Sequence, residues 1–521
     1  MNKVISLLLV LAVMFSMSGC AERKTEETGK NETGIVLSDS GITVDGEAIG
    51  EEGDFAVYAA RDIVFYLAGQ GITYGEGKEA DEHTLAEADA HTVVHITKPG
   101  TYRLSGKLSA GQIAVDLGEG AEEDPAAVVT LILDGADITC AVAPAIIFYR
   151  VFECGSTETE TASEMVDTSA AGANIVIADG SENTVSGAYV ARIYKSCTLS
   201  EDGTEVVDSK KLHKYDGAVY SKMSMNIFGE TDGSGVLNIN AENEGLDSEL
   251  HLTIHGGEIN IISGNDGINT NEDGVSVTTV NGGTVNIRVT GATGEGDGID
   301  SNGWLVINGG TVIASACADS EDAGIDSDCG IYLNGGTVIA GGNMLDAIAG
   351  GAQNYAEFRF AEKQSDGRTY TLKNANGEAL LSVTPENAFS GLIISSPDLA
   401  EGECTLWCGD AQLVHGGAVG GEMPRGGVGE PFEREDGQMP PEGERPDGPN
   451  GETWDGGIRP EMPDGERHEP PEGFPGNAPD GEKQFPQGEK PPMNMGEAGE
   501  SSENFTISSG GSFFAGIREK I

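Results

Sequence analysis

The sequence predicts an all-β chain whose short strands stack as a parallel β-helix, a three-sided solenoid. A Gly-Gly corner followed by alternating apolar residues occurs four times, and successive corners lie 26, 27 and 26 residues apart. The copies span residues 256–261, 282–287, 309–314 and 335–340. A fixed period of this length is typical of chains that stack one supersecondary unit on the next.

A second element interleaves with the first: a residue that is usually acidic, then Gly, then an apolar residue. Its copies begin at Asp216, Glu244, Asp266, Asp297 and Ala323, and the loops between copies differ in length. The period 298–315 holds three short strands, at 298–301, 304–308 and 311–315, separated by Gly or Asn residues that tolerate left-handed corners. Alternating Ile, Val and Thr disfavour helices. Three strands per repeat predict a three-sided coil, whereas a propeller blade needs roughly 40–45 residues.

The first 19 residues resemble the signal peptide of a bacterial lipoprotein. Lys3 precedes an apolar run over residues 4–15, which is shorter than the roughly 20 residues that a membrane-spanning helix needs. Small residues then lead to Cys20, the expected lipidation site and mature N-terminus. The alternative is an ordinary signal peptide that is cleaved nearby. Residues 20–54 are polar and charged, which predicts a flexible tether.

Residues 55–413 are expected to form the parallel β-helix domain. From 414 to 504 the chain is rich in Gly, Pro and Glu, and such a segment buries too little apolar surface to fold, which predicts disorder. Residues 505–521 regain strand character and are expected to supply a closing strand. Seven cysteines remain besides Cys20. None has the spacing of a zinc site, and their pairing stays open.

The charge of the chain limits its partners. It carries 86 acidic and 30 basic residues, a formal net charge of −56. A field of this sign repels nucleic acid and anionic membrane surfaces and attracts cations. We therefore exclude nucleic acid as a partner and expect membrane attachment only through the lipid anchor, on the outer face of the cell membrane.

Stacked repeats would align acidic residues in columns. Equivalent residues of neighbouring strands lie roughly 4.8 Å apart, and the residue after each inward apolar position should point outward. The candidate ligands, to which Glu249 also belongs by position, are Asp216, Glu244, Asp247, Asp266, Asn269, Asn271, Asp297, Asp300, Asn302, Asp326 and Asp328. Carboxylates this close repel one another unless a cation lies between them. Calcium, which takes 6–8 oxygen ligands in irregular geometry, is the metal that this set predicts. The alternative is a column of Asp and Asn residues that only cap turns.

The sequence does not identify catalytic residues. No acidic pair stands apart from the columns, as a hydrolase would require. A lyase would need a base beside calcium, for which Lys222 and Arg288 are the candidates, although surface cations are the simpler interpretation. Trp304 and Tyr332 fall at nearly equivalent places in adjacent repeats and are candidates for stacking on sugar, together with Lys222 and Arg288 as carbohydrate-binding residues; a packing role is the alternative.

Several segments together resemble a known family. They are 174–185 (NIVIADGSENTV), 216–222 (DGAVYSK) and the Gly-Gly-Thr and Asp-Gly-Ile repeats. These are similar to the clostridial cellulose- and acidic-sugar-binding proteins, the carbohydrate-binding domain-containing proteins. The resemblance implies a pectate-lyase-like right-handed parallel β-helix with bound calcium. It also implies binding of polygalacturonate and cellulose without established catalysis. Ala323 in place of an acid, and the apparent insertion at 149–170, depart from the pattern.

We therefore expect an extracellular, calcium-dependent carbohydrate-binding lipoprotein for a plant cell-wall or acidic polysaccharide. Two alternatives stay open. A pectate lyase would release unsaturated products, and a structural surface adhesin would bind no glycan.

Overall fold

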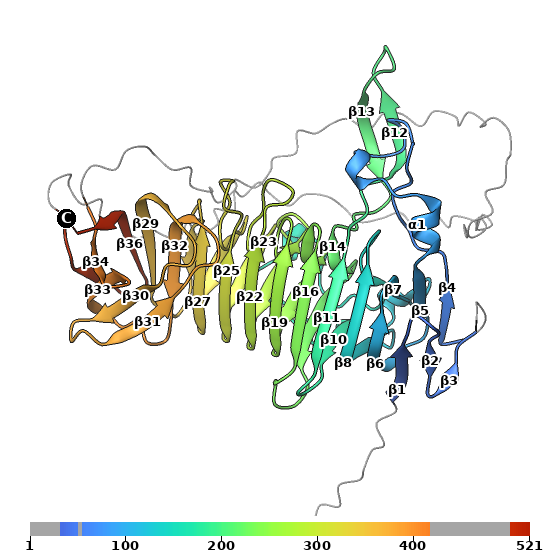
Figure 1. Ribbon diagram of the computed structural model, residues 1–521, viewed down its shortest axis with the longest axis horizontal. Coiled ribbons are helices and arrows are strands. Elements are labelled where there is room, and N and C mark those ends of the chain that lie inside the picture. The colour runs from blue at the N-terminus through green and yellow to red at the C-terminus, as the bar shows by residue number, and fades with distance from the viewer. Residues whose placement is uncertain (1–31, 51–54, 417–500, 521) are drawn as a thin grey trace, which may run out of the picture. The chain divides into compact units, whose positions relative to one another are not determined.

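Parallel strands from successive repeats pair in three series in this computed structural model, which describes residues 32–50, 55–416 and 501–520 (Figure 1). The first, here the ladder series, consists of β5 (Thr92–Ile96), β7 (Gly111–Asp116), β9 (Ile146–Arg150), β14 (Gly217–Ser221), β17 (Glu244–Ser248), β20 (Ile268–Thr270) and β23 (Ile299–Ser301), with β4 (Val57–Ala60) antiparallel to β5.

The other two series share their early strand β8 (Val129–Cys140). The second consists of β6 (Gly100–Leu108), β8, β10 (Ala173–Ile177), β15 (Met225–Gly229), β18 (Leu252–Ile254), β21 (Val277–Val280), β24 (Trp304–Ile307), β26 (Gly330–Leu333) and β28 (Ile348–Gly350). The third continues from β8 through β11 (Glu182–Gly187), β16 (Val236–Ala241), β19 (Glu258–Ser263), β22 (Thr284–Val289), β25 (Thr311–Ser315) and β27 (Thr337–Gly342).

The all-β prediction is confirmed. The described residues contain only one α-helix and three 3₁₀ helices, each of five residues or fewer: η1 (Glu79–Asp81), α1 (Leu85–Asp89), η2 (Ala121–Glu123) and η3 (Thr159–Thr161). Among these residues, none of the helices has the length and apolar character needed to cross a bilayer.

Apolar side chains in register build the core between the series. Leu246, Ile268 and Ile299 occupy one register position of the ladder series, and each is fully buried. At the corner 309–310, the second Gly is required for two reasons. Gly310 has a φ of +79°, and a Cβ there would lie 2.6 Å from the carbonyl oxygen of Gly283 in the preceding repeat. Only glycine accommodates both the left-handed backbone and this contact.

The folded part of the chain begins earlier than the predicted tether boundary. Residues 32–48 form β1 (Glu32–Leu37), β2 (Thr43–Val44) and β3 (Glu47–Ala48), and β1 pairs with β6. Ile35 and Leu37 are buried in the main core. The prediction of a flexible tether over 20–54 is therefore wrong for this stretch, because the alternating apolar residues of β1 cover the first strands of the stack. The signal peptide and Cys20 lie outside the described residues.

Antiparallel strands follow the last repeat. They are β29 (Tyr355–Gln364), β30 (Tyr370–Asn374), β31 (Ala379–Val383), β32 (Phe389–Ser395), β33 (Gly402–Cys408), β34 (Ala411–Val414), β35 (Phe505–Ile507) and β36 (Gly511–Glu519). Strand β32 pairs with β27, and β36 is parallel to β29. Residues 505–521 thus contribute two strands where one was expected, and the predicted disordered segment lies almost entirely outside the described residues.

The apparent insertion at 149–170 packs along the outward face of the second series. The Glu153 carboxylate accepts a hydrogen bond from the Ser224 N–H at 2.6 Å. Thr168 donates to the Thr253 hydroxyl at 2.7 Å, and the Asn226 amide donates to the Thr168 carbonyl at 2.8 Å. This segment therefore buries polar side chains of β15 and β18 that alternation alone would place in solvent.

Candidate acidic metal site

The ladder series places the predicted acidic residues in columns. Asp247, Asn269 and Asp300 occupy one register position, after Tyr220 of β14. Three residues earlier, Glu244, Asp266 and Asp297 align, since the Gly245 N–H donates to the Asp266 carbonyl and the Gly267 N–H to that of Asp297. A third column holds Glu249, Asn271, Asn302 and Asp328, whose N–H groups donate to residues 221, 248, 270 and 301 of the preceding strands. We call these three columns the acidic ladder.

Asp216 does not join the column of Glu244. The register pairs Gly217 with Glu244, so Asp216 lies one residue out of place, beside Asn243. Asp326 extends the column of Asp300, because its N–H donates to the Ile299 carbonyl at 2.7 Å. The sequence pattern therefore located the columns but misplaced their first member. Ala218 is an extra residue between Gly217 and Val219, and Val219 is the residue that pairs with Leu246.

Several ladder residues are buried, which corrects the expectation that they point into solvent. Asp247 is 0% exposed, Glu244 6%, Asn269 7% and Asp266 8%. Main chain of the next repeat covers two of these rungs: the Asp297 N–H donates to Asp266 Oδ1 at 2.7 Å, and the Ala323 N–H donates to Asp297 Oδ1 at 2.5 Å. Asp328, by contrast, is exposed.

Burial and mutual repulsion raise the pKa of the ladder carboxyls. Burial, followed by the neighbouring carboxylates, holds the pKa values of Glu244 and Asp247 well above their ordinary range. The same causes place the pKa of Asp326 at about 6. Burial raises the pKa of Asp266 to about 7 and that of Asp346, which the sequence argument did not include, to about 8. These carboxyl groups ionise at neutral pH only at a cost to the fold.

Three buried oxygen atoms at the centre of the ladder have no hydrogen-bond partner: Glu244 Oε2, Asp247 Oδ2 and Asn269 Oδ1. Asn269 donates to the other oxygen of Glu244 at 3.1 Å, and Asn271 donates to the other oxygen of Asp247 at 2.5 Å. In native proteins almost every buried polar group is paired, and an unpaired one costs about 1–3 kcal/mol. These oxygen atoms are therefore suited to an added cation.

Among the described residues, the ion pairs of the protein reach Asp216 and none of the buried ladder carboxylates. Arg192 forms an ion pair with Asp216 at 3.3 Å. Across the described residues, no ion pair involves Glu244, Asp247, Asp266, Asp297, Asp300, Asp326 or Asp346. These ladder carboxylates thus lack an ion pair within the described part of the chain, and Glu244 and Asp247 each keep one oxygen without a hydrogen-bond donor.

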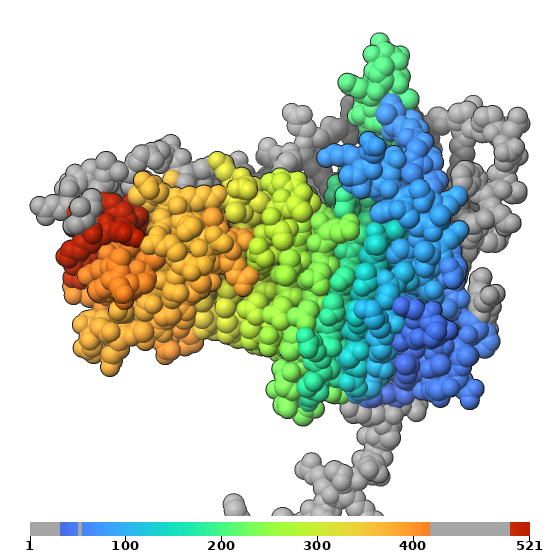
Figure 2. Space-filling model, viewed as in Figure 1, coloured from blue at the N-terminus to red at the C-terminus, as the bar shows by residue number. Residues whose placement is uncertain are grey.

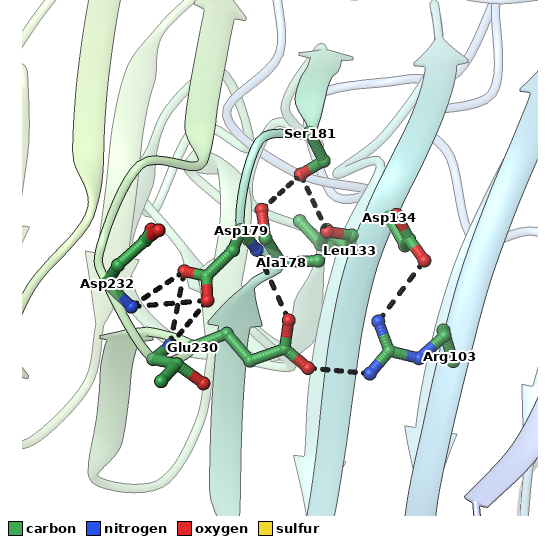
Figure 3. Close-up of polar contacts among 9 residues, drawn as sticks. Arg103, Leu133, Asp134, Ala178, Asp179, Ser181, Glu230 and Asp232 are labelled. Carbon is green, nitrogen blue, oxygen red and sulfur yellow. Dashed lines mark hydrogen bonds and ion pairs between the residues drawn. The ribbon is translucent and has the colours of Figure 1, made fainter.

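At another corner of the fold, a carboxylate has hydrogen-bond donors for both of its oxygen atoms (Figure 3). Asp179 lies between β10 and β11, and its carboxylate accepts the main-chain N–H groups of Thr231, Asp232 and Gly233 at 3.1–3.2 Å. The nearby Glu230 accepts from Arg103 at 2.7 Å. Asp179 therefore acts as a turn-stabilising acceptor, whereas Glu244 and Asp247 each keep one buried oxygen without a donor.

The donor set fits calcium better than a metal that requires a compact protein cage. No three His, Cys, Asp or Glu side chains in the described part of the chain are arranged to hold a metal ion on their own. An ion at the ladder would need amide or main-chain oxygen as well as carboxylate, and calcium accepts that mixture. Asn269 supplies an unpaired amide oxygen beside Glu244.

The candidate sugar-binding residues do not form one site. Trp304 pairs with Gly330, whereas Tyr332 pairs with Val306, so the two aromatic residues are not equivalent in adjacent repeats. Arg288 belongs to the third series and donates to Asn387 at 3.4 Å. Lys222 occupies the position that precedes Glu249 in the third column, but its ammonium is 3.1 Å from Glu122 and lies over the Tyr149 ring. Because both cations already have partners, we assign neither a catalytic role.

The cysteines contribute no crosslink to this site. Cys140, Cys154, Cys197, Cys317, Cys329, Cys404 and Cys408 are all free thiols. Sequence reasoning also missed Arg192 and Lys214, which lie on either side of the inserted hairpin β12 (Tyr194–Leu199) and β13 (Val206–Lys211). The signal was available, since Lys residues cluster in the long loop before Asp216.

Comparisons with known proteins place the chain in a family. No curated protein matches it. A solved structure described as a polysaccharide lyase-like protein from C. thermocellum, a gadolinium derivative, is 20% identical and aligns over 61% of this chain and 92% of its own, with a TM-score of 0.36. The model of the carbohydrate-binding domain-containing proteins matches residues 90–384, more than half of the chain and all of the acidic ladder. The chain belongs to the carbohydrate-binding domain-containing protein family.

Proposed function

We propose that this protein is a right-handed parallel β-helix that binds calcium along the acidic ladder and, through calcium, an acidic polysaccharide. The observation that carries the proposal is the group of three unpartnered, buried oxygen atoms on Glu244, Asp247 and Asn269, in two neighbouring columns whose side chains form no ion pair with a described residue. The three series of parallel strands support the helical architecture, and the family supports a carbohydrate ligand.

Calcium would both stabilise the fold and help to bind the ligand. Inside the ladder it would offset the repulsion that raises the carboxyl pKa values. At the exposed end, near Asp328, it would share coordination with a sugar carboxylate. A chain with a net charge of −56 repels a polyuronate without such a bridge. The proposed ligand is therefore a polymer of carboxylated sugars such as polygalacturonate.

Two measurements on the same protein test the proposal. Calcium added to metal-stripped protein should raise its melting temperature, and a chelator should reverse the rise. Polygalacturonate should co-sediment with the protein in calcium and not in chelator, while a neutral glucan tests for charge-independent binding. Binding that persists in chelator contradicts the calcium bridge. Binding to no glycan at all favours a surface adhesin, and unsaturated products favour a lyase.

We propose in addition that the protein is a lipoprotein on the outer face of the cell membrane, on the basis of the sequence before Cys20. Cys20→Ala should release the protein from the membrane fraction and abolish labelling with a fatty acid. A variant that stays membrane-bound and labelled contradicts this proposal.

A further inference from the structure

The hairpin β12–β13 has one strand edge that stays open. The hairpin forms a two-stranded sheet of its own and projects from the surface of the stacked strands (Figure 2). Residues 74–76 border the base of β12, since the Tyr194 N–H donates to the Tyr74 carbonyl at 2.8 Å and Gly75 bridges to Ile193. Among the described residues, β13 pairs with β12 alone. The outer edge of β13 therefore presents main-chain N–H and C=O groups that lack a strand partner.

The hairpin also exposes apolar side chains. Val207 of β13 is 61% exposed, and Leu212, directly after β13, is 56% exposed. A sheet of only two strands is marginally stable in water, and further strands stabilise it by pairing with its edge and covering apolar surface. An additional strand beside β13 would provide both. The open edge is therefore suited to a strand from another molecule.

The charges of β13 restrict which strand can pair with it. Charged side chains on an edge strand normally prevent pairing, but the order Asp208, Ser209, Lys210 is an exception when the segment meets itself. In an antiparallel pair of two copies centred on Ser209, each Asp208 lies opposite the partner's Lys210. Opposite charges directly across a strand pair stabilise it, whereas like charges destabilise it. The segment is thus complementary to a second copy of itself.

Asp208 and Lys210 are available for this contact. Both are exposed, and neither forms an ion pair within the described part of the chain. Lys211, by contrast, is 3.1 Å from Glu76, so a register that places Asp208 opposite Lys211 would compete with an existing ion pair. Residues 188–216 contain five acidic and five basic residues. The hairpin connection therefore has no net charge to repel a second copy, unlike the chain as a whole.

We infer that β13 pairs antiparallel with β13 of a second copy about a two-fold axis at Ser209, which joins two hairpins in one four-stranded sheet. The contact is isologous, because the same residues serve both copies. It is small, so the dissociation constant should be on the order of 10–100 µM. The inference goes beyond the proposed function and does not depend on it, because neither calcium nor glycan takes part in the contact.

Sedimentation equilibrium of the full chain tests the pairing, with Cys20→Ala in every protein to remove the expected lipid anchor. Asp208→Lys and Lys210→Asp each replace two attractive contacts of the dimer by two repulsive ones, so each should weaken the dimer about tenfold or more. An equimolar mixture of the two variants restores both attractive contacts and should form a heterodimer about as stable as the wild-type dimer. Lys195→Asp, at an exposed residue of β12, is the matched control and should dimerise within about twofold of the wild type.

Recovery of the dimer in the mixture would support the inference and show that both variants are folded. A wild type that stays monomeric up to about 200 µM overturns it. A wild-type dimer that neither substitution weakens also overturns it, since another surface then holds the two copies together. So does a mixture of correctly melting variants that fails to dimerise, because Asp208 then does not meet Lys210. None of these outcomes decides the calcium bridge, which the binding of polygalacturonate tests separately.

Discussion

Asp266→Asn removes one buried charge from the acidic ladder and leaves its hydrogen bond in place. Asp266 is 8% exposed, and its Oδ1 accepts the Asp297 N–H at 2.7 Å. An asparagine oxygen accepts the same bond, so the substitution changes the charge more than the packing. The variant therefore isolates the cost of ionising a ladder carboxyl.

The size of this cost follows from the pKa. Burial raises the pKa of Asp266 from 3.8 to about 7. The native state thus keeps a proton that the unfolded chain releases, and the free energy of unfolding falls as pH rises between these two values. One pKa unit corresponds to about 1.4 kcal/mol, so the loss amounts to up to about 4 kcal/mol. Below about pH 4 both states are protonated and the effect vanishes.

In chelator at about pH 8, Asp266→Asn should therefore be more stable than the wild type by about 2–4 kcal/mol, and the difference should disappear at about pH 4. Calcium should close or reverse the gap, because the ionised carboxylate then has a cation. Denaturant unfolding at both pH values, with and without calcium, measures these differences. Asp319→Asn, at a side chain that is 97% exposed, controls for net charge. A variant no more stable than the wild type at about pH 8 in chelator would refute the reasoning.

Two further predictions concern the whole ladder and the stacking of the repeats. In chelator, the melting temperature of the wild type should fall between about pH 4 and pH 8, because burial places the pKa of Asp326 at about 6 and that of Asp346 at about 8. Calorimetry should show that calcium removes this dependence of the melting temperature on pH. A melting temperature that does not change with pH in chelator would contradict the account. Gly310→Ala should destabilise the fold by at least about 1 kcal/mol, since its Cβ would meet the neighbouring repeat. Gly294→Ala, at a positive φ with nothing within 4 Å, is the control, and equal losses in thermal unfolding would show that stacking is not the cause.

The periodicity of the sequence predicted much of the candidate site. The Gly-apolar-acid order was enough to align Asp247, Asn269 and Asp300, because the apolar residue between them must face the core in every repeat. The same alternation predicted that these side chains would be exposed, and Asp247 is fully buried. Burial depends on loops from neighbouring repeats, and the two-residue period of a strand contains no information about what covers its outer face.

Two further errors have separate causes. Asp216 resembles Glu244 in sequence, but the extra residue Ala218 before the buried Val219 shifts it by one register position. The many charged residues of 20–54 favoured a tether and outweighed the short apolar run of β1. Ile35 and Leu37 are buried because β1 pairs with the distant strand β6. Such long-range pairings leave no local signal in a single sequence.

Diffraction from crystals grown in calcium, recorded for the anomalous signal of the metal, tests the central claim most directly. The account predicts peaks along the acidic ladder, one of them within bonding distance of Glu244, Asp247 and Asn269. A well-ordered ladder with no peak beside these three side chains would contradict it.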